Sequence, residues 1–444
     1  MITAYSLIIL GVFSLTSAFL WPYYKRDTLN PFILLKAVVL LAVFYPLLTG
    51  QSEVSSDAKF VIAMAASFHV LVLDLLFILS SRRRKATVAF QKGDRRTKIF
   101  WLTAWLFGLG VRAASLAMGN LYGTLLATQL DVTSTSNLIG IGNGIPAIAM
   151  IGYIVFSSKD YNKFLVFLMV GVEIIWNLMS GSKVGVVYGL IPVLYVAQRT
   201  GIVQITLKKI MIVGALVLLL APFFFVTVTA YRVSVQSNVI SNGSMNIQTL
   251  SDGLHDSLFS ATVRQTARDI VNNSESALSR TDYVSFFGLL YDRPDLWKAF
   301  DRPDTITPAV VWWIPRYLWA DKPINDVGSW FGQHVFGWSG TTRSQAAITI
   351  WGDGLLNLGP AGVFIFPLVL FGFVFLFLEY CNRIGPWGLI LLAATYVKLA
   401  LSVEATLALS LIAMQVQAVL VLLSYLLSRL LAPIRTQSIP RSVR

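Results

Sequence analysis

The densest group of chemically active side chains lies in the stretch 308–328, PAVVWWIPRYLWADKPINDVG. Trp319 lies near Arg316, and Asp321 and Lys322 follow at once. A guanidinium fork binds phosphate oxygens, and aromatic rings pack on the C–H faces of sugars. These residue types predict a site for a ligand that carries a sugar, a pyrophosphate and an acyl chain. Tryptophan and arginine also anchor proteins at membrane interfaces, which is the structural alternative.

A second group of candidates surrounds Asp353, which lies between two glycines in the run WGDGLLNLGPAG at 351–362. An accessible carboxylate beside a hydroxyl can take its proton as a new C–O bond forms, so Asp353 is the first candidate for a general base. His334 and Asp321 are the other two. Asp353 could equally be a calcium or turn ligand, or cap the helix that follows. His334 is one of three histidines, and a lone histidine more often makes a structural hydrogen bond.

A third candidate is the segment SGSK at 180–183, which joins two apolar runs with almost no loop. Small residues allow a tight turn that exposes backbone N–H groups, Ser182 and the Lys183 ammonium to an anion. The segment is therefore a candidate phosphate seat, and a bare turn between two helices is the alternative.

Composition determines which elements must hold these groups. The 444-residue chain is 56% hydrophobic and 13% charged, whereas ordinary soluble domains have about 25% charged residues. A hydrocarbon core about 30 Å thick needs about 20 apolar residues per helix. The chain therefore reads as an all-α, polytopic transmembrane bundle. Its apolar runs predict eleven spans, at roughly 2–21, 31–50, 59–80, 99–118, 137–157, 163–180, 184–198, 208–230, 359–379, 385–402 and 405–428.

The basic residues predict the orientation of these spans. The formal net charge of +13 could suit nucleic acid, but most lysines and arginines lie in short turns between apolar runs. Positive turns stay cytoplasmic, which predicts an extracytoplasmic N-terminus and a cytoplasmic C-terminus. No nucleic-acid partner is expected, while contact with anionic lipids stays open. The cytoplasmic turns are expected at 25–26, 82–98, 159–163, 199–209, 383 and 429–444.

The chain divides into three parts: spans one to eight at 1–230, a cap at 231–358, and three more spans with a basic tail at 359–444. The cap is too aromatic for a disordered linker. Leucines and other apolar residues recur at helical spacing over 247–271, which predicts one amphipathic helix. It would lie at the membrane interface or roof a cavity, or simply pack within the cap.

Six ionisable residues lie within or beside the predicted spans, where a charge costs about 2.5–3.5 kcal/mol on insertion scales. For three of them we expect structural pairing or snorkelling: Lys36, Asp74 and Arg112. Glu173 is expected to lie buried beneath the cleft. Lys398 and Glu404 are expected to pair with each other or to face a cavity. The one cysteine, Cys381, excludes an intrachain disulfide and a cysteine-based zinc site.

The chain resembles the oligosaccharide repeat-unit (Wzy-type) polymerases of bacterial surface polysaccharide assembly. Three features carry the likeness: the SGSK turn at 180–183, IPRYLWADKP at 314–323, and GDGLLNLGPAG at 352–362 entering a span after one large loop. The resemblance implies a GT-C-like membrane fold in the bacterial inner membrane. It also implies an inverting glycosyltransferase that needs no metal ion or cofactor and acts at the extracytoplasmic face.

Such a polymerase transfers a growing glycan from one undecaprenyl-pyrophosphate carrier to a lipid-linked repeat unit. The resemblance implies that cations stabilise the leaving pyrophosphate and that Asp353, His334 or Asp321 deprotonates the acceptor. The implied pyrophosphate and substrate ligands are Arg316, Lys322, Lys183, Arg232, Arg343, Ser182 and Trp319. The family commonly has arginine where this chain has Lys183, and glutamate where it has Asp353.

Two other functions fit the same layout less closely. An O-antigen-ligase-like transferase uses the same type of donor and also has a large loop. A flippase of lipid-linked oligosaccharides, or another transporter, would carry charges through the bundle and little mass outside the membrane. Besides the lipid-linked oligosaccharides, the expected partners are membrane lipids, and a chain-length regulator is a further candidate.

Overall fold

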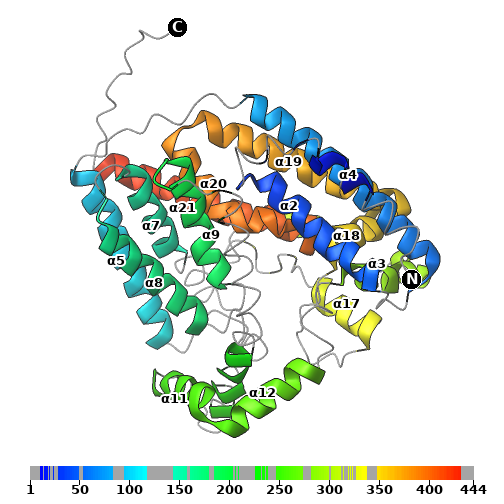
Figure 1. Ribbon diagram of the computed structural model, residues 1–444, viewed down its shortest axis with the longest axis horizontal. Helices are drawn as coiled ribbons and strands as arrows, with labels where there is room; N and C mark the ends of the chain where they lie inside the picture. Colours follow the sequence, from blue (N-terminus) through cyan, green and yellow to red (C-terminus); the bar gives the residue numbers. More distant parts are fainter. Residues whose placement is uncertain are drawn as a thin grey trace.

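The computed structural model describes much of the 444-residue chain, and all regular structure in the described residues is helical (Figure 1). The prediction of an all-α protein is confirmed for this part of the chain. The described residues are 11–13, 15–18, 20, 24, 29–49, 54–83, 95–117, 144–157, 161–179, 185–203, 206, 209, 226–231, 233–235, 237–238, 247–273, 282–299, 302–311, 314, 319, 321, 323, 327–337 and 348–431.

Among the described residues, helices fill most of nine of the eleven predicted apolar runs. They are α2 (Pro31–Val39), continued by the π-helix η1 (Leu40–Phe44) and α3 (Tyr45–Thr49), then α4 (Ser56–Arg83), α5 (Arg95–Ala117), α7 (Ile145–Phe156), α8 (Lys163–Met179), α9 (Gly185–Arg199), α19 (Gly362–Arg383), α20 (Pro386–Ala400) and α21 (Leu407–Leu431). The predicted spans 2–21 and 208–230 lie largely outside the described residues.

Three helical stretches of the described chain are long and apolar enough to cross a membrane: Ser56–Ser81, Thr349–Arg383 and Leu407–Leu430. Helix α4 shows why. Its polar residues Ser67, His69, Asp74 and Ser80 are buried, while the face that it exposes is apolar. An exposed apolar face of this kind marks contact with a membrane or with another protein. The exposed face is formed by Phe60, Met64, Phe68, Leu71 and Leu75.

The cap consists of short helices between α9 and α19. They are α11 (Ile247–Phe259), α12 (Ala261–Asn273), α14 (Tyr283–Tyr291), α15 (Pro294–Trp297), α16 (Thr307–Val311), α17 (Val327–Phe336) and α18 (Thr349–Leu358). In Figure 1, α11 and α12 lie at the lower edge of the molecule, and α17 and α18 at its right.

The single helix predicted over 247–271 is wrong, because two helices occupy this segment. The Ser260 hydroxyl accepts a hydrogen bond from the Val263 N–H at 3.3 Å, as an N-cap does, so Ser260 starts α12. Helix α11 is amphipathic with its small polar residues turned inward. Thr249 and Ser257 are buried, while Leu254 is 52% exposed.

The described helices have two distinct ends. At one end, the Ser55 N–H donates to the Asp292 carboxylate at 2.9 Å, which ties the start of α4 to the cap helix α14. At the other end, the Trp387 ring lies 5.5 Å from Trp101, 5.5 Å from Phe156 and 5.2 Å from Tyr425. This aromatic cluster joins the ends of α5, α7, α20 and α21, where the predicted basic turns begin. We call the two the cap end and the basic end.

Four of the six flagged charges form buried pairs. Lys36 Nζ lies 2.8 Å from the Asp74 carboxylate, and the Arg112 guanidinium binds both Glu173 oxygens, at 2.8 and 2.9 Å. The expected structural pairing is confirmed for Lys36, Asp74 and Arg112. Glu173 is buried as expected, and its partner is an arginine of α5.

The chain reverses between α18 and α19. Gly359 has φ +63°, a backbone conformation that glycine adopts at little cost. Gly354 and Gly362 then meet across the hairpin, so closely that a Cβ on Gly354 would lie 2.1 Å from the Gly362 carbonyl oxygen. The part of Thr349–Arg383 that is long enough to cross a membrane is therefore α19, whose 22 residues extend about 33 Å.

Candidate functional site at the cap end

Asp353 lies in the middle of α18 and is fully buried, with 0% of its surface exposed. The expectation of an accessible carboxylate is therefore wrong. The two glycines beside it do not open a loop around Asp353. Instead, they let α18 pack closely, Gly354 against α19 and Gly352 near Leu290 of α14.

The Asp353 carboxylate binds the start of α21. One oxygen accepts the Leu407 N–H at 2.7 Å, and the other accepts the Asn357 side-chain amide at 3.1 Å. The Thr305 hydroxyl also hydrogen-bonds to this carboxylate and accepts from the Asn357 amide at 2.8 Å. The first N–H groups of a helix lack partners within the helix, and negative charge is favourable there. Asp353 therefore caps α21 from another helix, and it does not cap the predicted ninth span.

Replacing Asp353 tests this capping role. Asp353→Ala should lower stability by about 1–3 kcal/mol for each buried donor that loses its acceptor. Asp353→Asn keeps one acceptor oxygen and should lose less. Thermal unfolding of the purified variants in detergent measures both. If Asp353→Asn has wild-type stability but no glycosyl transfer, Asp353 is the base rather than a cap.

A second buried contact lies beside this cap. The Tyr283 hydroxyl, at the start of α14, hydrogen-bonds to the Glu404 carboxylate in the turn η3 (Ser402–Glu404) between α20 and α21. Desolvation raises the pKa of Glu404 above its ordinary value, although the hydrogen bond from Tyr283 acts in the opposite direction. Burial also raises the pKa of Tyr283. The pair joins the cap to the turn that Asp353 also holds.

The raised pKa of Glu404 predicts a pH dependence of stability. Between the ordinary pKa of about 4.5 and the higher folded value, the unfolded chain loses this proton before the folded chain does. The contribution of Glu404 is therefore fully present below pH about 4.5 and is lost as pH rises through the folded pKa. Glu404→Gln cannot ionise at this position. Its free energy of unfolding should therefore increase relative to that of the wild type as pH rises across this window. Unfolding midpoints over a pH series check the sign, and a Glu404→Gln stability that falls relative to wild type as pH rises contradicts it.

His69 makes structural hydrogen bonds. Its Nδ1 accepts the Trp351 indole N–H at 3.1 Å, and its Nε2 donates to the Phe364 carbonyl at 3.2 Å. His69 thus joins α4 to α18 and α19.

The exposed candidates lie on the cap. Trp319 is 39% exposed, and Asp321 and His334 are exposed. His334 Nδ1 donates to the Trp330 carbonyl at 2.9 Å, and the two rings stack with centroids 5.0 Å apart. With Nδ1 protonated, the neutral ring carries its lone pair on Nε2, which is the atom a general base needs.

Six predicted ligands lie outside the described residues: Ser182, Lys183, Arg232, Arg316, Lys322 and Arg343. Their roles stay predictions. The structure brings Asp353 together with residues that the sequence did not single out, namely Asn357, Thr305 and the backbone of Leu407. Asn357 had a signal, because it lies four residues after Asp353 on the same helix face. Thr305 and Leu407 are distant in sequence and had none.

Comparison of the chain with protein-family models, curated proteins and solved structures finds no match.

Proposed function

We propose that this chain is a polysaccharide polymerase of the bacterial inner membrane. It would join undecaprenyl-pyrophosphate-linked repeat units at the extracytoplasmic face by inverting glycosyl transfer. In this proposal the bundle has eleven spans and a GT-C-like arrangement, with the N-terminus outside and the C-terminus in the cytoplasm. The residue pattern of the sequence is the basis for the eleven spans and for the orientation.

The observation that carries the proposal is the position of the cap. Its helices α14 and α18 pack on α4 and α19 at the end opposite the aromatic cluster and the basic turns. Positive residues are retained on the cytoplasmic side, so the cap would lie outside the cell. A lipid-linked glycan in the outer leaflet would meet the indole, carboxylate and imidazole groups that the cap exposes.

The reaction assigns each group a defined task. The acceptor hydroxyl oxygen attacks the anomeric carbon of the donor, the bond from that carbon to the pyrophosphate oxygen breaks, and the configuration inverts. His334 Nε2 or the Asp321 carboxylate takes the acceptor proton. The cations Arg316 and Lys322 would neutralise the departing pyrophosphate, with Lys183, Arg232 and Arg343 as further candidates.

Burial changes the task of Asp353. Both of its oxygens already accept hydrogen bonds from within the protein, so we assign it as a positioning residue. It holds the cap helix α18 against the start of α21 and thereby fixes the cap on the helices below it.

The proposal is tested with the purified full-length protein in detergent and a lipid-linked repeat unit as the only substrate. Lengthening of the glycan without any ion gradient supports transferase activity and excludes pure transport. His334→Gln and Asp321→Asn are made separately, and the variant that removes the base should lose at least about 100-fold in rate. Full activity in both, with Arg316→Ala also fully active, would overturn the proposed site.

A deletion strain separates polymerase from ligase. Loss of a polymerase leaves lipopolysaccharide capped with a single repeat. Loss of a ligase leaves free lipid-linked polymer. The two products differ in length on a gel, so one strain distinguishes the two transferases.

A further inference from the structure

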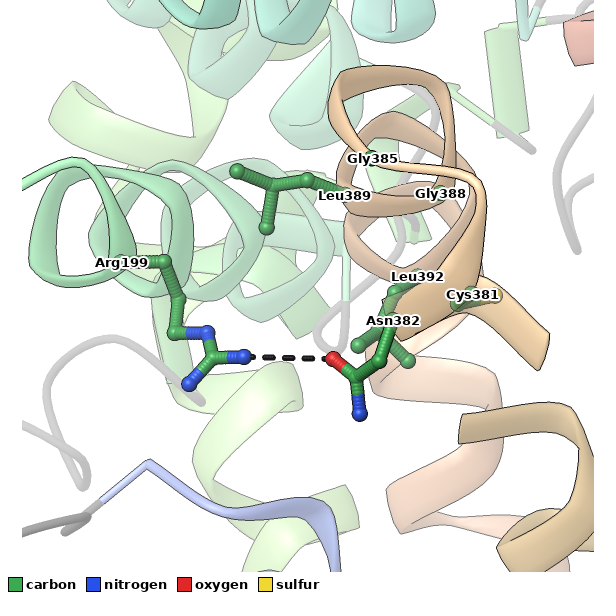
Figure 2. A pocket seen from close by; sticks show the side chains of 7 residues that line it. All are labelled: Arg199, Cys381, Asn382, Gly385, Gly388, Leu389 and Leu392. Atoms are coloured by element: carbon green, nitrogen blue, oxygen red, sulfur yellow. Dashed lines mark hydrogen bonds between the residues drawn. The ribbon is translucent and has the colours of Figure 1, made fainter. Parts of the chain in front are cut away.

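A small pocket lies at the basic end, far from the cap (Figure 2). It is formed where α9 ends, at Arg199, and where α19 turns into α20, around Asn382 and Gly385. Asn382 lies near the end of α19, whose length of about 33 Å separates it from the α18 hairpin. The pocket is therefore no part of the candidate site around Asp353.

The polar side chains that line the pocket, Arg199 and Asn382, both carry hydrogen-bond donors. The Arg199 Nη2 donates to the Asn382 amide oxygen at 3.3 Å, and Figure 2 shows the two side chains reaching toward each other from their helices. A guanidinium has five N–H donors, and the Asn382 amide has two more. Among the described residues, no carboxylate lines the pocket and none forms an ion pair with Arg199.

The surroundings hold these donors in place. The Arg199 guanidinium lies over the Tyr195 ring, 5.9 Å from its centroid, and that ring packs against Tyr396 at 4.6 Å. Across the pocket, a Cβ on Gly388 would lie 1.8 Å from the Cys381 carbonyl oxygen, so α19 and α20 approach at backbone distance. The other side chains of the wall are apolar, from Cys381, Leu389 and Leu392.

We propose that this pocket binds the phosphate group of an anionic ligand, and that its source is a phospholipid headgroup. Arginine recognises phosphate through paired N–H donors, and basic pockets between membrane helices bind anionic headgroups. The cavity volume is only about 10 Å³, room for about one water-sized group. A phosphate oxygen could enter it beside Arg199 while the rest of the headgroup lies outside, whereas a glycan could not. The nearby cluster of Trp387 and Tyr425 is typical of the membrane–water interface.

The test measures binding to the purified full-length protein in detergent and is independent of any transferase activity. Three probes are titrated while thermal unfolding is followed: phosphatidylglycerol, phosphatidylcholine and inorganic phosphate. Phosphatidylglycerol should raise Tm in a saturable way, and Arg199→Gln should weaken this binding at least tenfold. The matched control is Arg383→Gln, which removes an exposed arginine near the same turn and should stay within about twofold of wild type.

A second variant separates the loss of lipid binding from a loss of folding. Asn382→Asp places a carboxylate beside Arg199, where it can pair with the guanidinium, so the fold should be kept while the anion is repelled. Loss of phosphatidylglycerol binding in this folded variant supports the site. If inorganic phosphate binds as well as the lipid and also depends on Arg199, the phosphate site stands but its lipid source is wrong. Saturable binding that is unchanged in Arg199→Gln and Asn382→Asp, or no saturable binding by any probe, overturns the proposal.

Discussion

Gly354→Ala should prevent the α18–α19 hairpin from closing and leave little folded protein. The added Cβ would lie 2.1 Å from the Gly362 carbonyl oxygen, and this backbone atom cannot rotate away as a side chain could. Overpacking usually costs about 1–3 kcal/mol, and we expect more than about 3 kcal/mol here because the two helices must separate. The yield of monodisperse protein in detergent and its Tm measure the effect.

The matched control is Gly352→Ala, two residues earlier in the same helix. A Cβ there would meet Ile348 at 3.4 Å and Leu290 at 3.6 Å, which are ordinary contact distances. Alanine is favoured over glycine within a helix by about 1 kcal/mol, so this variant should be as stable as wild type or slightly more stable. If both variants behave alike, the close approach of Gly354 and Gly362 is not what holds the hairpin.

Glu173→Ala should be strongly destabilising. It leaves the Arg112 guanidinium buried without its carboxylate, and removing one partner of a buried pair costs about 3–5 kcal/mol. Both side chains are almost fully buried, at 5% and 2% exposure, so water cannot replace the lost partner. Unfolding of the variant in detergent, followed by Tm or by denaturant midpoint, measures the loss.

Two controls identify the cause. The double variant Arg112→Met/Glu173→Met removes both charges together and should recover much of the stability, because well-packed apolar residues often replace a buried pair at little cost. Asp295→Ala breaks the exposed pair with Arg293 and should change Tm little, since surface ion pairs contribute little. If Glu173→Ala melts like wild type, the pair is not a structural element of the bundle.

These outcomes bear on the site, because α18 carries both the glycine contact and Asp353. A hairpin that opens in Gly354→Ala would also remove the Asp353 cap from α21. Activity lost in that variant therefore says nothing about catalysis. Variants of exposed residues, His334 and Asp321, are the informative ones for the reaction.

The sequence by itself predicted the all-helical class seen in the described residues, the position of most apolar helices, and structural pairing or snorkelling for Lys36, Asp74 and Arg112. Each of these predictions follows from a constraint that acts within a short stretch of the chain. An apolar run of sufficient length must satisfy its backbone within a helix, and an ionised group in such a run must find a partner. Lys36 with Asp74, and Arg112 with a carboxylate, obey this rule.

Only the tertiary structure decided what the GDG run and its neighbours do. In the sequence, the glycines beside Asp353 suggest an open turn. In the structure, a glycine is needed at position 354 because the backbone of Gly362 lies directly against it. Asp353 is buried because its oxygens meet the first N–H of a helix that begins 54 residues later. Glu404 likewise meets Tyr283, more than a hundred residues earlier in the chain. No periodicity or spacing encodes such contacts, since they arise from how distant helices pack in space.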